Sequence, residues 1–266
     1  MVNSVYRQWW LRIPTVPFPS RDIGSWAHHG MESGCHRRTT GCHRMDDRMS
    51  QEALTGDPVA LARALIATPS VNPELEATGT GEAAIAERTA EWMRAWGLSV
   101  ETSEVAAGRW NVVGRLAGEG AGPTLLLNGH LDTVGVAGMT VDPFGAELRD
   151  GRLWGRGSCD MKGGVAALLS AAARIAQKPT PGTLIVALTA DEEYASLGMQ
   201  ALVGAGLGAD AAVVCEPTSL AVMPAHKGFV WVEADFRGRA AHGSRPAKWA
   251  WTPSVTRAVT SLRWMH

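Results

Sequence analysis

Between residues 57 and 215, amphipathic helical segments alternate with short, continuous runs of apolar residues, and no other feature of the sequence constrains the fold as strongly. Asp57-Pro58 is a helix N-cap followed by a proline at the first helical position, so a helix is predicted to begin there. Further helices are expected at residues 83–96, 162–177 and 197–205. Apolar strands are expected at residues 98–104, 110–117, 124–129, 184–188 and 211–215, the last two of them buried. This alternation is typical of an α/β fold with a mixed, mostly parallel sheet covered by helices on both faces.

The two ends of the chain do not continue this pattern. Residues 1–48 show neither helical nor strand periodicity, so we expect an unstructured or misassigned leader there. Arginine is plentiful in that segment, but its acidic residues and the lack of an amphipathic face argue against a transit peptide. Residues 49–226 are expected to form the main domain. From residue 227 the pattern changes, and residues 229–236 read as the first strand of a second, smaller α+β domain.

Composition argues against several classes of partner. The formal net charge is -1, so neither nucleic acid nor an anionic membrane is expected to bind the protein. No apolar run approaches the ~20 residues that a membrane helix needs. The cysteines are few and irregularly spaced, which argues against a disulfide framework and favours a reducing cytoplasm. Cys35-His36 and Cys42-His43 match no common zinc finger, and we interpret their pairing as a coincidence.

Four short polar motifs lie at or just beyond the ends of expected strands, which is where open α/β sheets place their sites. The side chains that they carry are, in chain order, His130 with Asp132, Asp160, Glu192 with Glu193, and Glu216. Asp160 lies in a glycine-rich segment at the start of the helix expected at residues 162–177. A phosphate-binding loop does not fit that segment, because neither of the known glycine spacings is present.

Each motif taken alone has a simpler interpretation. His130 can be a histidine at a strand end, Asp160 a helix N-cap, and the Glu192-Glu193 pair a solvated acidic turn. A metal site accounts for all of them together. A metal-bound histidine needs an acceptor for its second ring nitrogen, and Asp132 stands close enough in sequence to supply one. Adjacent carboxylates repel each other unless a cation or a proton compensates their charge.

In this order and setting, the residues resemble a known family. They are similar to the motifs of the dinuclear-zinc amidohydrolases and peptidases, which include acetylornithine deacetylase, succinyl-diaminopimelate desuccinylase, aminoacylase and glutamate carboxypeptidase. The resemblance covers about residues 52–246. It implies a zinc-exopeptidase-like catalytic domain at residues 49–226, with an inserted α+β lid or dimerisation domain beginning at residue 227.

The resemblance also implies a set of metal ligands. His130 and Glu216 match the terminal ligands of one zinc ion, and Asp160 matches the carboxylate that bridges both ions. Glu193 matches a ligand of the second zinc ion. The family's peptide bond after the bridging aspartate, here Asp160-Met161, is usually cis. Two zinc ions are therefore expected in a complete site, and cobalt or manganese can replace zinc at nitrogen and oxygen ligands.

Catalytic roles follow from the same resemblance. Glu192 matches the general base, and Asp132 matches the partner that orients His130. His242, in Ala-Ala-His-Gly-Ser, matches a histidine of the smaller domain that reaches the active site of a partner subunit and stabilises the oxyanion. The expected reaction is hydrolysis of an amide bond in an N-acyl amino acid or a small peptide, by a homodimer in the cytoplasm.

The carboxyl end departs from the family pattern. The family's fifth ligand is a histidine near the end of a longer chain, and His266 has no matching context. After Pro246 the resemblance stops, and residues 247–266 contain no acidic residue, which indicates a shifted reading frame. We therefore expect residues 227–266 to be the truncated beginning of the lid domain. Two alternatives stay open: an inactive, truncated family member that holds at most one zinc ion, and a dipeptidase or carboxypeptidase of the same family.

Overall fold

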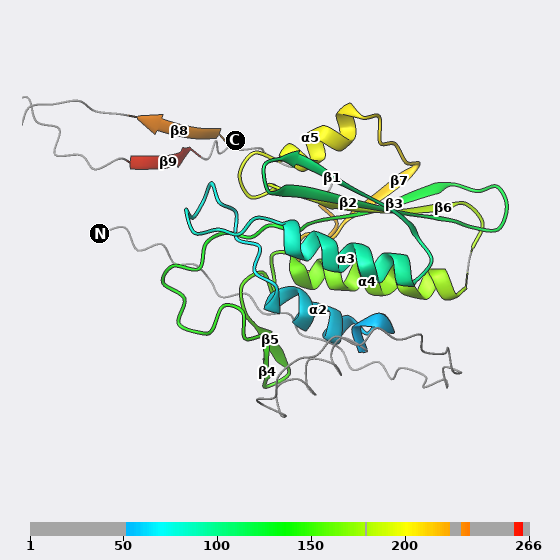
Figure 1. Ribbon diagram of the computed structural model, residues 1–266, viewed down its shortest axis with the longest axis horizontal. Coiled ribbons are helices and arrows are strands. Elements are labelled where there is room, and N and C mark those ends of the chain that lie inside the picture. Colours follow the sequence, from blue (N-terminus) through cyan, green and yellow to red (C-terminus); the bar gives the residue numbers. More distant parts are fainter. Residues whose placement is uncertain (1–51, 179, 224–229, 235–257, 263–266) are drawn as a thin grey trace, which may run out of the picture. The chain divides into compact units, whose positions relative to one another are not determined.

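The computed structural model describes residues 52–178, 180–223, 230–234 and 258–262 (Figure 1). The chain divides into two compact units, one up to Pro217 and one from Thr218. The first unit contains a five-stranded sheet in the order β1-β2-β6-β3-β7. Its strands are β1 (Ser99–Ala106), β2 (Arg109–Ala117), β6 (Thr183–Thr189), β3 (Thr124–His130) and β7 (Ala211–Val214). Its helices are α2 (Pro58–Ala67), α3 (Ala83–Ala95), α4 (Lys162–Gln177) and α5 (Leu197–Gly204).

The sheet is mixed, and the α/β fold class predicted from the sequence is confirmed. Strand β2 pairs antiparallel with both β1 and β6, whereas β3 pairs parallel with both β6 and β7. The three parallel neighbours β6, β3 and β7 therefore point the same way, and their carboxyl ends meet at one edge of the sheet. This is the edge where the predicted site residues stand.

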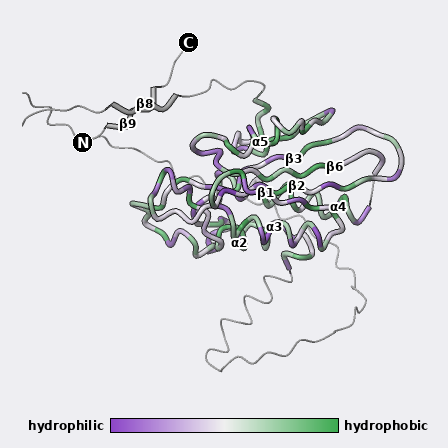
Figure 2. Tube along the Cα trace, turned by 45° about the horizontal axis from the view of Figure 1, so that its top comes forward, coloured by the Kyte–Doolittle hydropathy of each residue, from purple (hydrophilic) through white to green (hydrophobic). Residues whose placement is uncertain are grey.

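Helices cover both faces of the sheet, with α3 and α4 side by side on one face and α5 on the other (Figure 1). The side chains of β6 alternate between two apolar clusters. Leu184, Val186 and Leu188 belong to the large cluster with α3 and α4. Ile185 and Ala187 belong to a smaller cluster with α5. The hydropathy-coloured trace in Figure 2 shows these apolar strands running through the interior of the unit.

Local sequence signals explain where the helices begin and end. The side chain of Asp57 accepts hydrogen bonds from the backbone N–H groups of Val59 and Ala60, at 3.0 and 2.8 Å, as predicted for the N-cap of α2. Gly97 follows α3 with a φ of 89°, a left-handed conformation that glycine adopts at little cost. The bounds predicted for α4 agree with the structure at both ends.

Two local features differ from the predictions. The hairpin of β4 (Glu147–Arg149) and β5 (Arg152–Trp154) was not expected, although Asp150-Gly151 between the strands carries the signal for a two-residue turn. Both of these residues have positive φ, 54° and 68°. Strand β7 was predicted to be buried, and that prediction is wrong, since all four of its residues are exposed. It lies at the edge of the sheet, so that one side pairs with β3.

The second unit contains two described strands, β8 (Val230–Ala234) and β9 (Ala258–Leu262), which pair antiparallel. The strand predicted at residues 229–236 is confirmed at β8, whereas β9 was not expected from the sequence. Residues 1–48 lie outside the described part of the chain. Across the residues that are described, no helix has the length and apolar character needed to cross a membrane.

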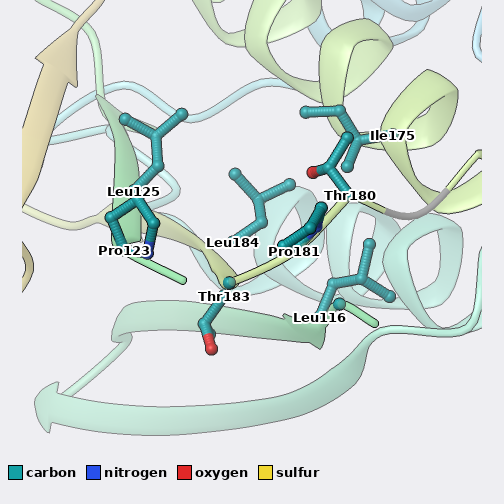
Figure 3. Close-up of a pocket in the computed structure, with 10 residues that line it drawn as sticks. Leu116, Pro123, Leu125, Ile175, Thr180, Pro181, Thr183 and Leu184 are labelled. Atoms are coloured by element: carbon teal, nitrogen blue, oxygen red, sulfur yellow. The ribbon is translucent and has the colours of Figure 1, made fainter. Parts of the chain in front are cut away.

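A cavity of about 220 Å³ opens at the amino ends of β3 and β6 (Figure 3). Its lining is mainly apolar and includes Leu116, Pro123, Leu125, Ile175 and Leu184. The predicted site residues follow the opposite, carboxyl ends of the same strands. The cavity therefore does not belong to that site.

Gly129 lets helix α4 pack closely against β3. A Cβ atom added at Gly129 would lie 2.9 Å from Val165 Cγ2, 3.1 Å from Met161 Cε and 3.2 Å from Leu168 Cδ2. These contacts are tighter than packed side chains normally make. The close approach sets the position of the amino end of α4, directly after Asp160.

We predict that Gly129→Ala lowers the free energy of unfolding by about 1–3 kcal/mol, the usual cost of overpacking a core. The control is Gly204→Ala at the end of α5, where an added Cβ meets no atom within 4 Å. That variant should be neutral or stabilised by up to about 1 kcal/mol, because alanine favours the helix. Urea denaturation measures both values, and equal effects in the two variants would contradict the packing described for Gly129.

Candidate metal centre

Three neighbouring parallel strands deliver side chains to the same edge of the sheet. His130 is the last residue of β3 and pairs in register with Thr189, the last residue of β6. The turn after β6 carries Glu192 and Glu193. Glu216 follows the end of β7 by two residues. Because these strands are adjacent and parallel, residues far apart in sequence come together beyond their carboxyl ends.

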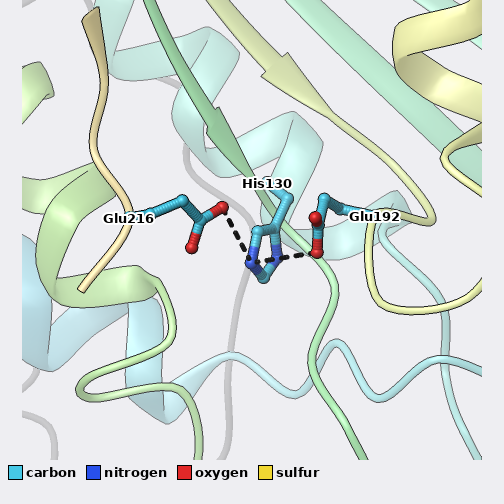
Figure 4. A group of neighbouring side chains, drawn as sticks. All are labelled: His130, Glu192 and Glu216. Carbon is cyan, nitrogen blue, oxygen red and sulfur yellow. Dashed lines mark ion pairs between the residues drawn. The ribbon is translucent and has the colours of Figure 1, made fainter. Parts of the chain in front are cut away.

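The His130 ring lies at the centre of the group. Its Nε2 atom is 3.1 Å from Asp160 Oδ1, 3.7 Å from Glu192 Oε2 and 3.9 Å from Glu216 Oε1. Figure 4 shows Glu192 and Glu216 approaching the ring from opposite sides. The His130 side chain is 1% exposed, while those of Asp160 and Glu192 are 55% and 46% exposed. One face of the group is therefore open to solvent.

The ligand atoms form two overlapping groups that can each hold a metal ion. The first contains His130, Glu192 and Glu216, and the second contains His130, Asp160 and Glu193. Within each group, one potential ligand atom per residue lies within 4.8 Å of the others. Imidazole nitrogen and carboxylate oxygen are ligands that zinc accepts, and cobalt and manganese accept them too. The donor set therefore fits a metal ion.

This geometry brings together all four residues predicted as metal ligands, and it adds Glu192, the predicted general base. The distances alone do not separate a base from a ligand, since Glu192 lies as close to His130 as Glu216 does. The role of each glutamate therefore stays a prediction. The peptide bond between Asp160 and Met161 is cis, which confirms what the resemblance implied for it. His242 lies outside the described residues.

Asp132 is fully buried and contacts both His130 and the turn after β6. His130 Nδ1 is 2.9 Å from the backbone oxygen of Asp132 and 3.5 Å from its carboxylate Oδ1. The carboxylate also accepts hydrogen bonds from the backbone N–H groups of Glu192 and Glu193, at 3.0 and 3.2 Å. The side chain of Asn72, which sequence reasoning missed, donates to Asp132 Oδ2 at 2.8 Å. No sequence signal links Asn72 to Asp132, because 60 residues separate them.

Burial, together with the neighbouring negative charges, raises the pKa of two carboxyl groups of the site. Burial, together with the charge of Asp160, raises the pKa of Glu193 to about 8. Burial also raises the pKa of Glu216 to about 7, with Asp160 and Glu192 adding to the shift and His130 opposing it. For His130, burial disfavours the charged ring, but hydrogen bonds to Asp132 and Asp160 raise its pKa well above its ordinary value. Without a metal ion, the group therefore retains protons, and a bound cation would replace them.

Comparison with known proteins gives a family match across this site. The model of peptidase family M20/M25/M40 matches residues 126–262, which is more than half of the chain. The match begins within β3 and includes every site residue from His130 to Glu216. It also continues to residue 262, past Pro246, where the resemblance was expected to stop.

Several solved structures are similar to the chain. An M20 family metallo-carboxypeptidase from Sulfolobus solfataricus has 22% sequence identity and a TM-score of 0.53, covering 60% of this chain and 37% of that one. Human carnosine dipeptidase 1 has 20% identity and a TM-score of 0.49, with 63% and 40% covered. A dinuclear metal-binding M20 peptidase from Bacillus subtilis has 20% identity and a TM-score of 0.44, with 58% and 40% covered. The first likeness supports the fold, and the chain spans about two fifths of the length of these structures.

The raised pKa values predict a pH-dependent response to metal. The pKa of Glu193 rises from 4.5 to about 8 on folding without metal, so the unfolded chain releases this proton first as the pH rises. The metal-free protein therefore loses stability as the pH rises from 4.5 to about 8. Zinc should restore this stability by compensating the negative charge of the ionised carboxyl group. We predict that zinc raises the melting temperature by a larger increment at pH 8 than at pH 6.

Differential scanning fluorimetry, with EDTA-treated protein as the reference, measures this increment. A Glu91→Gln variant, which alters an exposed carboxyl on α3, should show the same pH dependence as the unaltered chain. An increment that stays constant or shrinks between pH 6 and pH 8 would contradict metal binding at these carboxyl groups.

Proposed function

The chain belongs to peptidase family M20/M25/M40, and we propose that it hydrolyses the amide bond of an N-acyl amino acid or a small peptide in a metal-dependent reaction. The observation that carries this proposal is the convergence of carboxylates from Asp160, Glu192 and Glu216 on the buried Nε2 atom of His130. Such a group is a stable arrangement only when a cation or protons balance its charge. Its open face gives a substrate access to it.

The residues that would hold the metal are assigned from the family resemblance. We propose that His130, Asp160 and Glu216 bind one ion, and that Asp160 and Glu193 bind the other. Zinc suits these ligands best, with cobalt and manganese as substitutes. A pair of such ions lowers the pKa of water and polarises the substrate carbonyl.

Glu192 is proposed as the general base. Its side chain is 46% exposed, and its backbone N–H is fixed on the Asp132 carboxylate at 3.0 Å. A carboxylate that is held at its base and open at its tip can accept a proton from the attacking water and deliver it to the leaving nitrogen. A raised pKa is also typical of general bases, and Glu193 has one, so the two glutamates must be separated by experiment.

The substrate class and the assembly are further parts of the proposal. A deacetylase or desuccinylase of N-acyl amino acids and a dipeptidase or carboxypeptidase both require this amide chemistry. We propose the first class from the resemblance to acetylornithine deacetylase and succinyl-diaminopimelate desuccinylase. The resemblance also supports a homodimer in which His242 of one subunit stabilises the oxyanion in the active site of the other.

The two adjacent glutamates provide a test of the assigned roles. Glu192→Gln should lower kcat by at least about 100-fold, the contribution of a general base, and leave the binding of both zinc ions nearly unchanged. Glu193→Gln, the matched control one residue away, should weaken one zinc site instead. Zinc stoichiometry by mass spectrometry and hydrolysis of N-acetyl amino acids and dipeptides are measured on the same zinc-loaded samples.

Other outcomes would change the proposal. If both variants lost the same zinc equivalent, or if Glu192→Gln stayed active, the two roles would be wrongly assigned. Preferential cleavage of dipeptides would favour the peptidase alternative. Bound zinc without hydrolysis of either substrate class would favour a chain that holds metal but does not catalyse.

A further inference from the structure

A buried cluster of charged residues lies beneath the candidate metal centre. We define the arginine cluster as Glu82, Arg109, Asp132 and Asp191. We infer that Arg109 is a positioning residue that fixes the backbone of Asp191, Glu192 and Glu193 and thereby places the two glutamates at the metal centre. This inference rests on the proposed function, because it concerns how the metal ligands and the base are held.

Arg109, the first residue of β2, is the shared cation partner of three carboxylates. Its Nε is 2.8 Å from Glu82 Oε2, and its Nη2 is 2.6 Å from Glu82 Oε1, which makes a two-pronged ion pair. Its Nη1 is 2.8 Å from Asp191 Oδ1, and its Nη2 is 3.9 Å from Asp132 Oδ2. The flat, five-donor guanidinium can serve these directions at once, which a lysine ammonium cannot do.

The need for a cation at this place follows from burial. The side chains of Glu82, Asp132 and Asp191 are all 0% exposed, and that of Arg109 is 5% exposed. A buried carboxylate without a partner is very unfavourable, so three of them so close together require a compensating charge. Asn72 adds a neutral bridge, because its Nδ2 donates to both Asp132 Oδ2 and Asp191 Oδ1, at 2.8 and 3.0 Å.

The cluster is connected to the site through three successive backbone N–H groups. Asp191 N donates to Glu82 Oε1 at 3.3 Å, Glu192 N to Asp132 Oδ1 at 3.0 Å, and Glu193 N to Asp132 Oδ2 at 3.2 Å. Each acceptor is a carboxylate that contacts Arg109. Asp191 also has a φ of 65°, a left-handed conformation that is uncommon for residues other than glycine. The turn that carries the base and a metal ligand is therefore anchored to the arginine cluster at three successive residues.

The positions of its partners in the fold indicate that Arg109 does more than form a stabilising ion pair. Glu82 stands at the amino end of α3, Arg109 begins β2, Asp132 follows β3 and Asp191 follows β6. Replacing the guanidinium group would shift the side chains of Asp132 and Asp191 together, because both contact it. Because Asp132 also contacts His130, the shift would reach both the histidine and the glutamates of the centre.

The test compares Arg109→Lys with Arg115→Lys, the same substitution at an exposed position on the same strand. Arg109→Lys keeps the charge but loses the forked contacts, and we expect its zinc dissociation constant to rise about 10–100-fold, as for other residues that orient metal ligands. The visible absorption spectrum of the cobalt-loaded protein should change as well. Arg115→Lys should retain the zinc affinity and the cobalt spectrum of the unaltered chain.

A second variant covers the case in which Arg109→Lys does not fold. Glu82→Gln keeps the shape of the side chain, touches none of the metal ligands and should weaken zinc binding on the order of tenfold. Folded variants that melt at a lower temperature but keep the zinc affinity and the cobalt spectrum would overturn the inference, because the cluster would then be structural only. Absence of zinc binding in the unaltered chain would overturn the proposed function, and this inference with it.

Discussion

Repulsion between carboxylates at one edge of the sheet is the constraint on which the rest of the structure depends. Three carboxylates approach the Nε2 atom of the buried His130, those of Asp160, Glu192 and Glu216. Burial and mutual repulsion raise the pKa of Glu193 and Glu216, so this arrangement is stable only with protons or a metal ion in place. The carboxylates stay close together despite their repulsion because the strands and the helix that carry them are fixed by apolar packing elsewhere.

Two layers of interactions place the charged groups. Above, the parallel strands β6, β3 and β7 end at the same edge, and Gly129 allows α4 to come close enough to bring Asp160 beside His130. Below, Arg109 compensates three buried carboxylates, and two of these, on Glu82 and Asp132, accept hydrogen bonds from the backbone N–H groups of residues 191–193. The upper layer sets which residues meet, and the lower layer sets their orientation.

The sequence was sufficient where local signals decide the structure. The N-cap at Asp57, the bounds of α4 and the polar residues after β3 and β6 were all predicted, because each depends on neighbours within a few residues. The contacts of Asn72 and Arg109 with buried carboxylates could not be predicted, since those carboxylates lie between 23 and 119 residues away. The exposure of β7 also escaped prediction, because an apolar run does not show whether its strand lies inside the sheet or at its edge. Lys162 is similar: nothing local shows that this lysine is buried and donates to the backbone oxygen of Thr68.

The most direct test of the central claim is to locate the metal. Crystals of the chain grown with zinc, measured at the zinc absorption edge, give an anomalous difference map in which zinc stands out from all protein atoms. We predict a peak about 2.0–2.1 Å from His130 Nε2, the usual zinc–nitrogen distance, with carboxylate oxygens of the group around it. A map with zinc bound only elsewhere, and with His130 Nε2 still hydrogen-bonded to Asp160, would contradict the assignment of this group as a metal centre.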